Sequence, residues 1–322
     1  MAAWRFIDPH VHCRDWREAY KATIREVVEL ARSQGVVAVL DMPNTEPPIT
    51  SLELAERRAE TARSEGVDSG YYLYAAATPD EARLEEALEA VKRLRQVVGL
   101  KLYTAPMRGL EARDLESQRL VYRRLSELGY RGVLAVHCEK TSLFREELWD
   151  PSRPWTWNLC RPPEAEVESV RDQISLAVET GFSGTLYIVH ISNPASIRYV
   201  KQAREQGLRV VCGVTPHHLM LSSEDMAKPG GVALKVNPPL RERRLAEGLL
   251  ECVKAGDVDF LETDHAPHAS WEKYGPPYLS GIRSLENYLR CLRWLAENSV
   301  PDKILRDMTY NNSKRVFPMI EE

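Results

Sequence analysis

The sequence lacks any apolar run near the roughly 18 residues needed to span a bilayer. Its first residues, Met-Ala-Ala-Trp-Arg-Phe, do not form the apolar region of a signal peptide. A strong excess of one charge is also missing, because 43 Lys and Arg residues face 47 Asp and Glu residues, a net charge of −4. This balance provides no electrostatic basis for binding nucleic acid or an anionic membrane. We therefore expect a cytoplasmic protein whose partner is a small molecule.

Cysteine pairs of the Cys-x-x-Cys type are absent as well. The six cysteines, spread through 322 residues, predict neither a disulfide framework nor a cysteine-based zinc knuckle, and we expect them to be reduced thiols. With 43% hydrophobic and 28% charged residues, the composition excludes a disordered chain and predicts a substantial buried core.

Short β-branched and apolar runs alternate with longer amphipathic stretches throughout the chain. Strands are expected at 4–12, 36–43, 69–78, 97–104, 132–139, 185–192, 209–216 and 259–267. Helices are expected near 18–35, 51–66, 79–96, 114–129, 163–181, 194–207, 243–257 and 284–299. Eight such units predict an α/β fold, a (β/α)₈ TIM-type barrel, as a single domain over residues 1–322. An open doubly wound sheet is the alternative, but the Gly-x-Gly-x-x-Gly motif that would favour it does not follow the first strand.

Residues able to bind a metal lie toward the carboxyl ends of several expected strands, where barrel enzymes have their active sites. They are His10, His12, Lys101, His137, His190 and Asp264. His10 and His12 are two residues apart and project to the same side of a strand, whereas Cys13 projects to the other side and is a poor ligand candidate. One histidine at a strand end is usually structural. Four histidines and an aspartate on one face predict a site for Zn²⁺ or a similar ion.

Eight motifs occur in order between about residues 7 and 268. They are DPHVHCRD, DMPNT, GLKLYT, AVHCEK, IVHISN, TPHHLML, KVNPPLR and TDHAPH. Through these motifs the chain resembles the amidohydrolase superfamily and, within it, the dihydroorotase family. The resemblance implies the metal-dependent barrel fold of that superfamily. It also implies reversible cyclisation of N-carbamoyl-L-aspartate to L-dihydroorotate in de novo pyrimidine biosynthesis.

The resemblance further implies two Zn²⁺ or similar divalent ions, bridged by a hydroxide and by Lys101 carboxylated on its amine. Asp264 would contact the first ion and act as general acid and base. The other implied ligands are His10 and His12 for the first ion and His137 and His190 for the second.

A substrate-binding set is implied by the same resemblance. Arg14, Asn44 and His268 would hold the ring carboxylate, which suits the forked donors of a guanidinium. Backbone groups of Leu219 and Ala266 would meet the pyrimidine ring. Further pocket candidates are His217, His218 and Asn237.

The chain also departs from the family's pattern. Asp15-Trp16-Arg17 follows Arg14 where relatives often have Pro-Gly, and the paired-threonine lid of short dihydroorotases is replaced by TAPMRGLEARD at 104–114. Thr104 or Arg108 is a candidate substitute for that lid, and a lid supplied by another part of the chain is the alternative. Because the first strand begins near Met1 and little follows Phe317, we expect no terminal β-sandwich. The long connections 140–162 and 217–242 are expected to be functional.

Two other functions compete with this interpretation. A hydantoinase or allantoinase would share the metal ligands, but it would not need the carboxylate-binding set of Arg14, Asn44 and His268. A non-catalytic scaffold for aspartate transcarbamoylase would be expected to lose metal ligands, and this chain keeps all six. Association with aspartate transcarbamoylase, or into a homo-oligomer, is compatible with activity.

Overall fold

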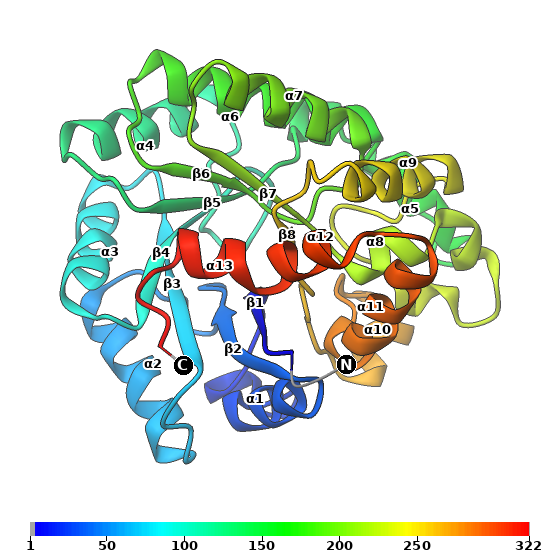
Figure 1. The fold of residues 1–322 in the computed structure, drawn as a ribbon, viewed down its shortest axis with the longest axis horizontal. Coiled ribbons are helices and arrows are strands. Elements are labelled where there is room, and N and C mark those ends of the chain that lie inside the picture. The colour runs from blue at the N-terminus through cyan, green and yellow to red at the C-terminus, as the bar shows by residue number, and fades with distance from the viewer. Residues whose placement is uncertain (1–3, 322) are drawn as a thin grey trace.

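The computed structural model describes residues 4–321 and contains an eight-stranded parallel sheet in the order β1 to β8 (Figure 1). The strands are β1 Phe6–Val11, β2 Val36–Asp41, β3 Tyr71–Ala77, β4 Val97–Tyr103, β5 Val133–His137, β6 Thr185–Ile188, β7 Val210–Val214 and β8 Phe260–Leu261. The two edges of the sheet meet where Val11 forms a parallel bridge with His265 and where His12 N donates to His265 O at 2.8 Å. The predicted (β/α)₈ barrel is confirmed.

Helices surround the barrel. They are α1 Ile24–Ser33, α2 Leu52–Ser64, α3 Glu81–Arg93, α4 Leu115–Glu127, α5 Trp157–Cys160, α6 Pro163–Glu179, α7 Pro194–Glu205, α8 Pro216–Met220, α9 Arg243–Lys254, α10 Ser270–Tyr274, α11 Tyr288–Glu297, α12 Asp302–Arg306 and α13 Asn312–Val316. Within residues 4–321, no helix has both the length and the apolar character needed to cross a membrane.

The helix expected at 18–35 begins only at Ile24. The Thr23 hydroxyl accepts from Glu26 N at 3.2 Å, and the Glu26 carboxylate accepts from Thr23 N at 2.8 Å. This capping box satisfies backbone donors that would otherwise lack a partner in the first turn, so it fixes where the helix starts. The chain before it forms a loop with one short 3₁₀ turn, Trp16–Glu18.

Strand alternation divides the core into two layers. In β3, Tyr72 and Tyr74 face the barrel interior, whereas Leu73 and Ala75 pack outward beneath the helices. The same alternation in the other strands fills the barrel with side chains, so functional groups are confined to its ends.

The C-terminal segment closes one end of the barrel, which the sequence did not predict. Figure 1 shows α12 and α13 lying across the barrel. The Phe317 ring lies 6.3 Å from Tyr74 and 6.2 Å from Phe260, centroid to centroid, and Asn312 Nδ2 donates to Asp259 O at 3.0 Å. Because Asp259 directly precedes β8, this segment covers the amino ends of the strands. The predicted site lies at the opposite end.

All eight strands are shorter than the sequence predicted, and β6 and β8 differ most at the site. β6 ends at Ile188 rather than 192, and β8 covers two residues rather than 259–267. His190 and Asp264 therefore follow their strands instead of lying in them. Both have left-handed backbone conformations, with φ of 38° and 46°, which interrupt regular strand geometry.

Candidate active site

A cavity of about 70 Å³ opens at the carboxyl end of the barrel. Its lining includes all six predicted metal ligands and three of the predicted substrate-binding residues. These are His10, His12, Lys101, His137, His190 and Asp264, together with Arg14, Asn44 and Ala266. The fold thus brings residues from opposite ends of the sequence to one small, polar space.

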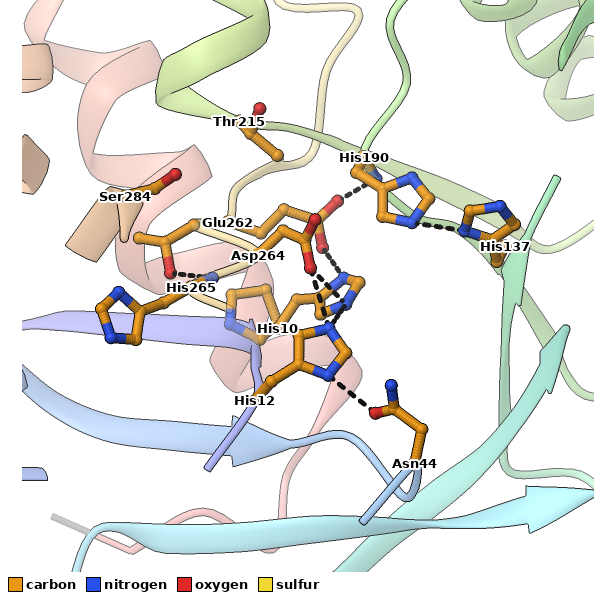
Figure 2. Close-up of polar contacts among 12 residues, drawn as sticks. His10, His12, Asn44, His137, His190, Thr215, Glu262, Asp264, His265 and Ser284 are labelled. Carbon is orange, nitrogen blue, oxygen red and sulfur yellow. Dashed lines mark hydrogen bonds and ion pairs between the residues drawn. The ribbon is translucent and has the colours of Figure 1, made fainter. Parts of the chain in front are cut away.

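His10, His12 and Asp264 form the tightest group in this cavity (Figure 2). His10 Nε2 lies 3.3 Å from His12 Nε2, and Asp264 Oδ1 lies 3.3 Å from the first nitrogen and 2.9 Å from the second. The two-residue spacing of the histidines places both rings on one side of β1, as predicted. All three side chains are buried, and their converging ligand atoms could hold a metal ion.

The hydrogen bonding of His12 leaves its inner nitrogen free to bind a cation. His12 Nδ1 is 2.7 Å from Asn44 Oδ1, and since an amide oxygen only accepts, Nδ1 carries the proton. In the neutral ring, Nε2 then presents a lone pair toward the carboxylate of Asp264. Two acceptors this close repel each other unless a cation lies between them, so the donor set fits a metal ion.

The second histidine pair is arranged in a similar way. His137 Nε2 donates to Glu139 Oε2 at 2.7 Å, which leaves His137 Nδ1 facing His190 Nε2 at 3.0 Å. Arg161 donates to both oxygens of Glu139, at 3.0 and 2.6 Å. Although burial alone would raise it, Arg161 and His137 hold the pKa of Glu139 below its usual range. The anionic Glu139 thereby fixes the ring orientation of His137.

Burial keeps the other imidazoles of the group uncharged. It lowers the pKa of His10 and His190 well below the usual value, and nearby cationic groups add to the effect. It also lowers the pKa of His137, against the opposing effect of Glu139. Neutral imidazoles keep the lone pairs that a metal requires.

Lys101 points into the same cavity from β4. Its side chain is fully buried, and its Nζ has no hydrogen-bond partner in the described structure. Burial lowers the pKa of Lys101 to about 8. This lysine is therefore far closer to the neutral amine at physiological pH than a surface lysine would be.

Two buried acids next to the ligands were missed in the sequence. Glu262 accepts from Tyr187 Oη and from the His190 backbone N–H, and its Oε2 lies 3.3 Å from His10 Nδ1. Burial raises the pKa of Glu262 to about 8. Glu139 is the other acid. Each lies two residues from a predicted ligand, Asp264 or His137, so the period of a strand could have identified both.

The left-handed backbones of His190 and Asp264 are held by tertiary contacts. Glu262 accepts from His190 N–H, and Asp264 N donates to His10 O at 2.9 Å. Non-glycine residues adopt this conformation at a cost, and they retain it where surrounding structure enforces it. Here it turns both side chains toward the cavity.

Arg14 and Asn44 line the cavity, and His268 lies behind Arg14. Arg14 Nε donates to Pro267 O at 3.2 Å, and its Nη2 lies 3.4 Å from His268 Nε2. His268 Nε2 also lies 3.0 Å from Ser280 O, so this nitrogen donates to that carbonyl. Among residues 4–321, no carboxylate forms an ion pair with Arg14, which is only 4% exposed. Its buried guanidinium is therefore available to an anion.

The remaining candidates differ in position. The backbone N–H of Ala266 is bonded to Ile282 O at 3.0 Å and that of Leu219 to Thr215 O at 3.1 Å, so neither is free for a ligand. Leu219 packs in the outer core, away from the cavity lining of the described chain. Asn237 lines the cavity.

Four other candidates do not line the cavity in the described chain. His217 Nδ1 lies 2.6 Å from Ser284 Oγ, and His218 Nε2 donates to Pro238 O at 3.0 Å. Thr104, suggested above as part of a lid, is fully buried and donates to His137 O at 2.8 Å. The interpretation of Thr104 as a lid residue is wrong, because its hydroxyl ties β4 to β5. Arg108 binds Glu18 with both terminal nitrogens, at 3.0 and 2.7 Å, and does not line the cavity.

No protein-family model matches the chain. In sequence, the chain is related to dihydroorotases. It is 35% identical over 278 residues to the dihydroorotase of Aeropyrum pernix, covering 85% of this chain and 59% of that protein. It is 32% identical over 286 residues to the dihydroorotase of Caldanaerobacter subterraneus subsp. tengcongensis, covering 87% and 64%. The chain thus spans roughly three fifths of the length of the curated relatives it matches.

Solved structures share the fold. L-hydantoinase (dihydropyrimidinase) from Arthrobacter aurescens superimposes with a TM-score of 0.86 at 23% identity, over 97% of this chain and 70% of that one. At this identity the likeness establishes the common barrel.

Proposed function

We propose that this chain, a relative of the dihydroorotases, interconverts N-carbamoyl-L-aspartate and L-dihydroorotate. The observation that carries the proposal is the position of Arg14, a buried guanidinium with no carboxylate partner among residues 4–321, beside the His10–His12–Asp264 group. A cyclic amide with a carboxylate on its ring would match both features. Hydantoin and allantoin carry no such carboxylate.

Two divalent cations, Zn²⁺ in our proposal, would be held by six side chains. When bound, they would polarise the ring carbonyl and lower the pKa of the attacking water toward neutrality. The ligands would be His10 and His12 with Asp264 at one ion, His137 and His190 at the other, and carboxylated Lys101 between them.

The environment of Lys101 supports its carboxylation. A buried amine with no hydrogen-bond acceptor is unfavourable as an ammonium ion. As a neutral amine it can add CO₂ and lose one N–H proton to solvent, and the resulting carbamate would supply oxygen ligands where the cationic side chain had none.

Asp264 would move the proton. Its carboxylate faces the cavity beside His12 Nε2, where it would accept a proton from the attacking water. It would then deliver this proton to the amide nitrogen as the ring C–N bond breaks. In the synthetic direction, Asp264 would remove a proton from the carbamoyl nitrogen.

Arg14 and Asn44 would orient the substrate. Arg14 would form a charge-assisted contact with the carboxylate, and His268 would support it from behind. Asn44 Nδ2 now lies 3.2 Å from Met107 Sδ, a weak acceptor that a carboxylate oxygen could replace. One barrel domain over residues 1–322 would carry the activity in the cytoplasm, alone or with aspartate transcarbamoylase.

Metal analysis of the purified protein, together with turnover of dihydroorotate, hydantoin and allantoin, tests the proposal. We expect two divalent ions per chain and a preference for dihydroorotate. Preferred turnover of hydantoin or allantoin would favour the other cyclic amidases, whereas a metal-free, inactive protein would favour a scaffold. Size-exclusion chromatography with added aspartate transcarbamoylase tests the association.

A further inference from the structure

Lys273 in α10 is a buried lysine whose Nζ bonds only to backbone carbonyls. Its Nζ donates to Lys235 O at 3.0 Å, Leu279 O at 2.9 Å and Gly281 O at 2.7 Å. The residue is 8% exposed, and no carboxylate in the described chain forms an ion pair with it. Its three N–H donors are thus matched by three acceptors.

These carbonyls belong to two segments that form one side of the cavity, residues 235–237 and 279–281, which we call the cavity wall. Val236 and Asn237 of the first segment line the cavity, as do Ser280 and Gly281 of the second. Gly281 N also donates to Lys235 O at 2.9 Å, so Lys273 and Gly281 share one acceptor. The ammonium therefore lies behind the wall and joins its two halves.

The wall also contacts the predicted carboxylate-binding residues. His268 donates to Ser280 O at 3.0 Å, and Arg14 lies against His268. At Gly281, where φ is 147°, an added Cβ would lie 2.8 Å from Ala266 O and 2.9 Å from the His268 ring. Movement of the wall would therefore be transmitted to the groups expected to contact the substrate.

We propose that Lys273 is a positioning residue that sets substrate affinity by tying residues 235–237 to residues 279–281. The inference rests on the proposed function for the identity of the substrate. In the described structure, Lys273 Nζ bonds to none of the predicted metal ligands. Those ligands lie in other parts of the chain. Loss of the ammonium should therefore affect ring binding more than metal content or the chemical step.

Lys273→Met tests this inference, because methionine retains most of the apolar stem and removes all three donors. Lys273→Gln, which keeps an amide donor, provides a milder variant that remains testable if the first does not fold. Lys21→Met is the matched control. Lys21 is also buried, at 7% exposure, but its Nζ binds Glu18 and Glu272 at 2.8 and 3.1 Å instead of the wall.

For Lys273→Met we expect KM for dihydroorotate, and Kd for orotate by calorimetry, to rise about tenfold or more, with kcat within about threefold of wild type. The KM of Lys273→Gln should lie between those of the wild type and Lys273→Met. Lys21→Met should keep the wild-type KM. Metal content should not change. Hydrogen exchange should accelerate in peptides covering 278–282 and remain unchanged in α6.

Unchanged KM and Kd in a folded Lys273→Met variant would overturn the inference even if exchange accelerates, since Lys273 would then act on stability alone. A fall in kcat accompanied by metal loss would also overturn it. If the wild type prefers another cyclic amide, the proposed function fails. KM for that amide, with the exchange data, then decides the role of Lys273.

Discussion

Replacing Arg14 with methionine tests the substrate assignment most directly. The side chain is buried, its backbone carbonyl accepts from Arg58 Nη1 at 3.2 Å, and its Nε is held by Pro267 O. Methionine replaces the unbranched stem of arginine without the charged guanidinium. The variant should keep its fold and its metal ligands, so a change in activity can be attributed to the lost guanidinium.

The expected loss of kcat/KM in Arg14→Met can be estimated because the Arg14 side chain is buried. Removing one partner of a desolvated, charge-assisted contact typically costs about 2 to 5 kcal/mol. That range corresponds to roughly 30-fold to several thousand-fold in kcat/KM, at about 1.4 kcal/mol per factor of ten. Burial lowers the pKa of Arg14, but an arginine remains protonated at neutral pH. The full charge is therefore lost in the variant.

The assay compares the turnover of two cyclic amides, one with a ring carboxylate and one without. Dihydroorotate should lose most of its kcat/KM, whereas dihydrouracil, which has no carboxylate, should not lose the same factor. Inhibition by orotate provides a second measurement if dihydrouracil turnover is too slow. Arg17→Met is the matched control, because Arg17 lies in the same loop, is 80% exposed and pairs with Glu46 at 3.6 Å. Unchanged orotate inhibition in Arg14→Met would refute the carboxylate contact.

Three further predictions concern Lys101, Asp264 and Glu18. Lys101→Ala should lose metal and activity together, with partial recovery in short carboxylic acids, and retention of two tightly held metals would contradict the carbamate. Asp264→Asn should lower the rate in both directions by about 10² or more, so a comparable kcat would remove Asp264 from proton transfer. Burial raises the pKa of Glu18, but bonds from Arg108 and Lys21 outweigh it and lower the pKa to about 2. Because this pKa is depressed, ionised Glu18 stabilises the fold above pH 4.5, and the contribution is lost as the pH falls from 4.5 to 2. The difference in unfolding free energy between wild type and Glu18→Gln should be about 3 kcal/mol at pH 7 and below about 1 kcal/mol at pH 2, and a difference that does not vary with pH would contradict the assignment.

Local signals were sufficient to predict most of the barrel. Each expected strand and helix is present, because apolar periodicity and helix caps act over a few residues. That His10 and His12 project to one side followed from strand alternation alone. The C-terminal segment was missed, since Phe317 and its apolar neighbours form no strand or long helix whose periodicity would mark them. Its partners Tyr74 and Phe260 lie far away in the sequence.

The sequence by itself determined the barrel class and the residue types at the carboxyl ends of its strands, since each depends on short-range patterns. Only the tertiary structure decided that Asp264 lies 2.9 Å from His12, across 252 residues of chain. It also decided that Arg14 is a buried cation with no carboxylate partner among residues 4–321. Lys273 shows why the sequence alone could not predict such contacts. In sequence it is one lysine in the connection between the last expected strand and the last expected helix, and only the folded chain brings three backbone carbonyls to its Nζ.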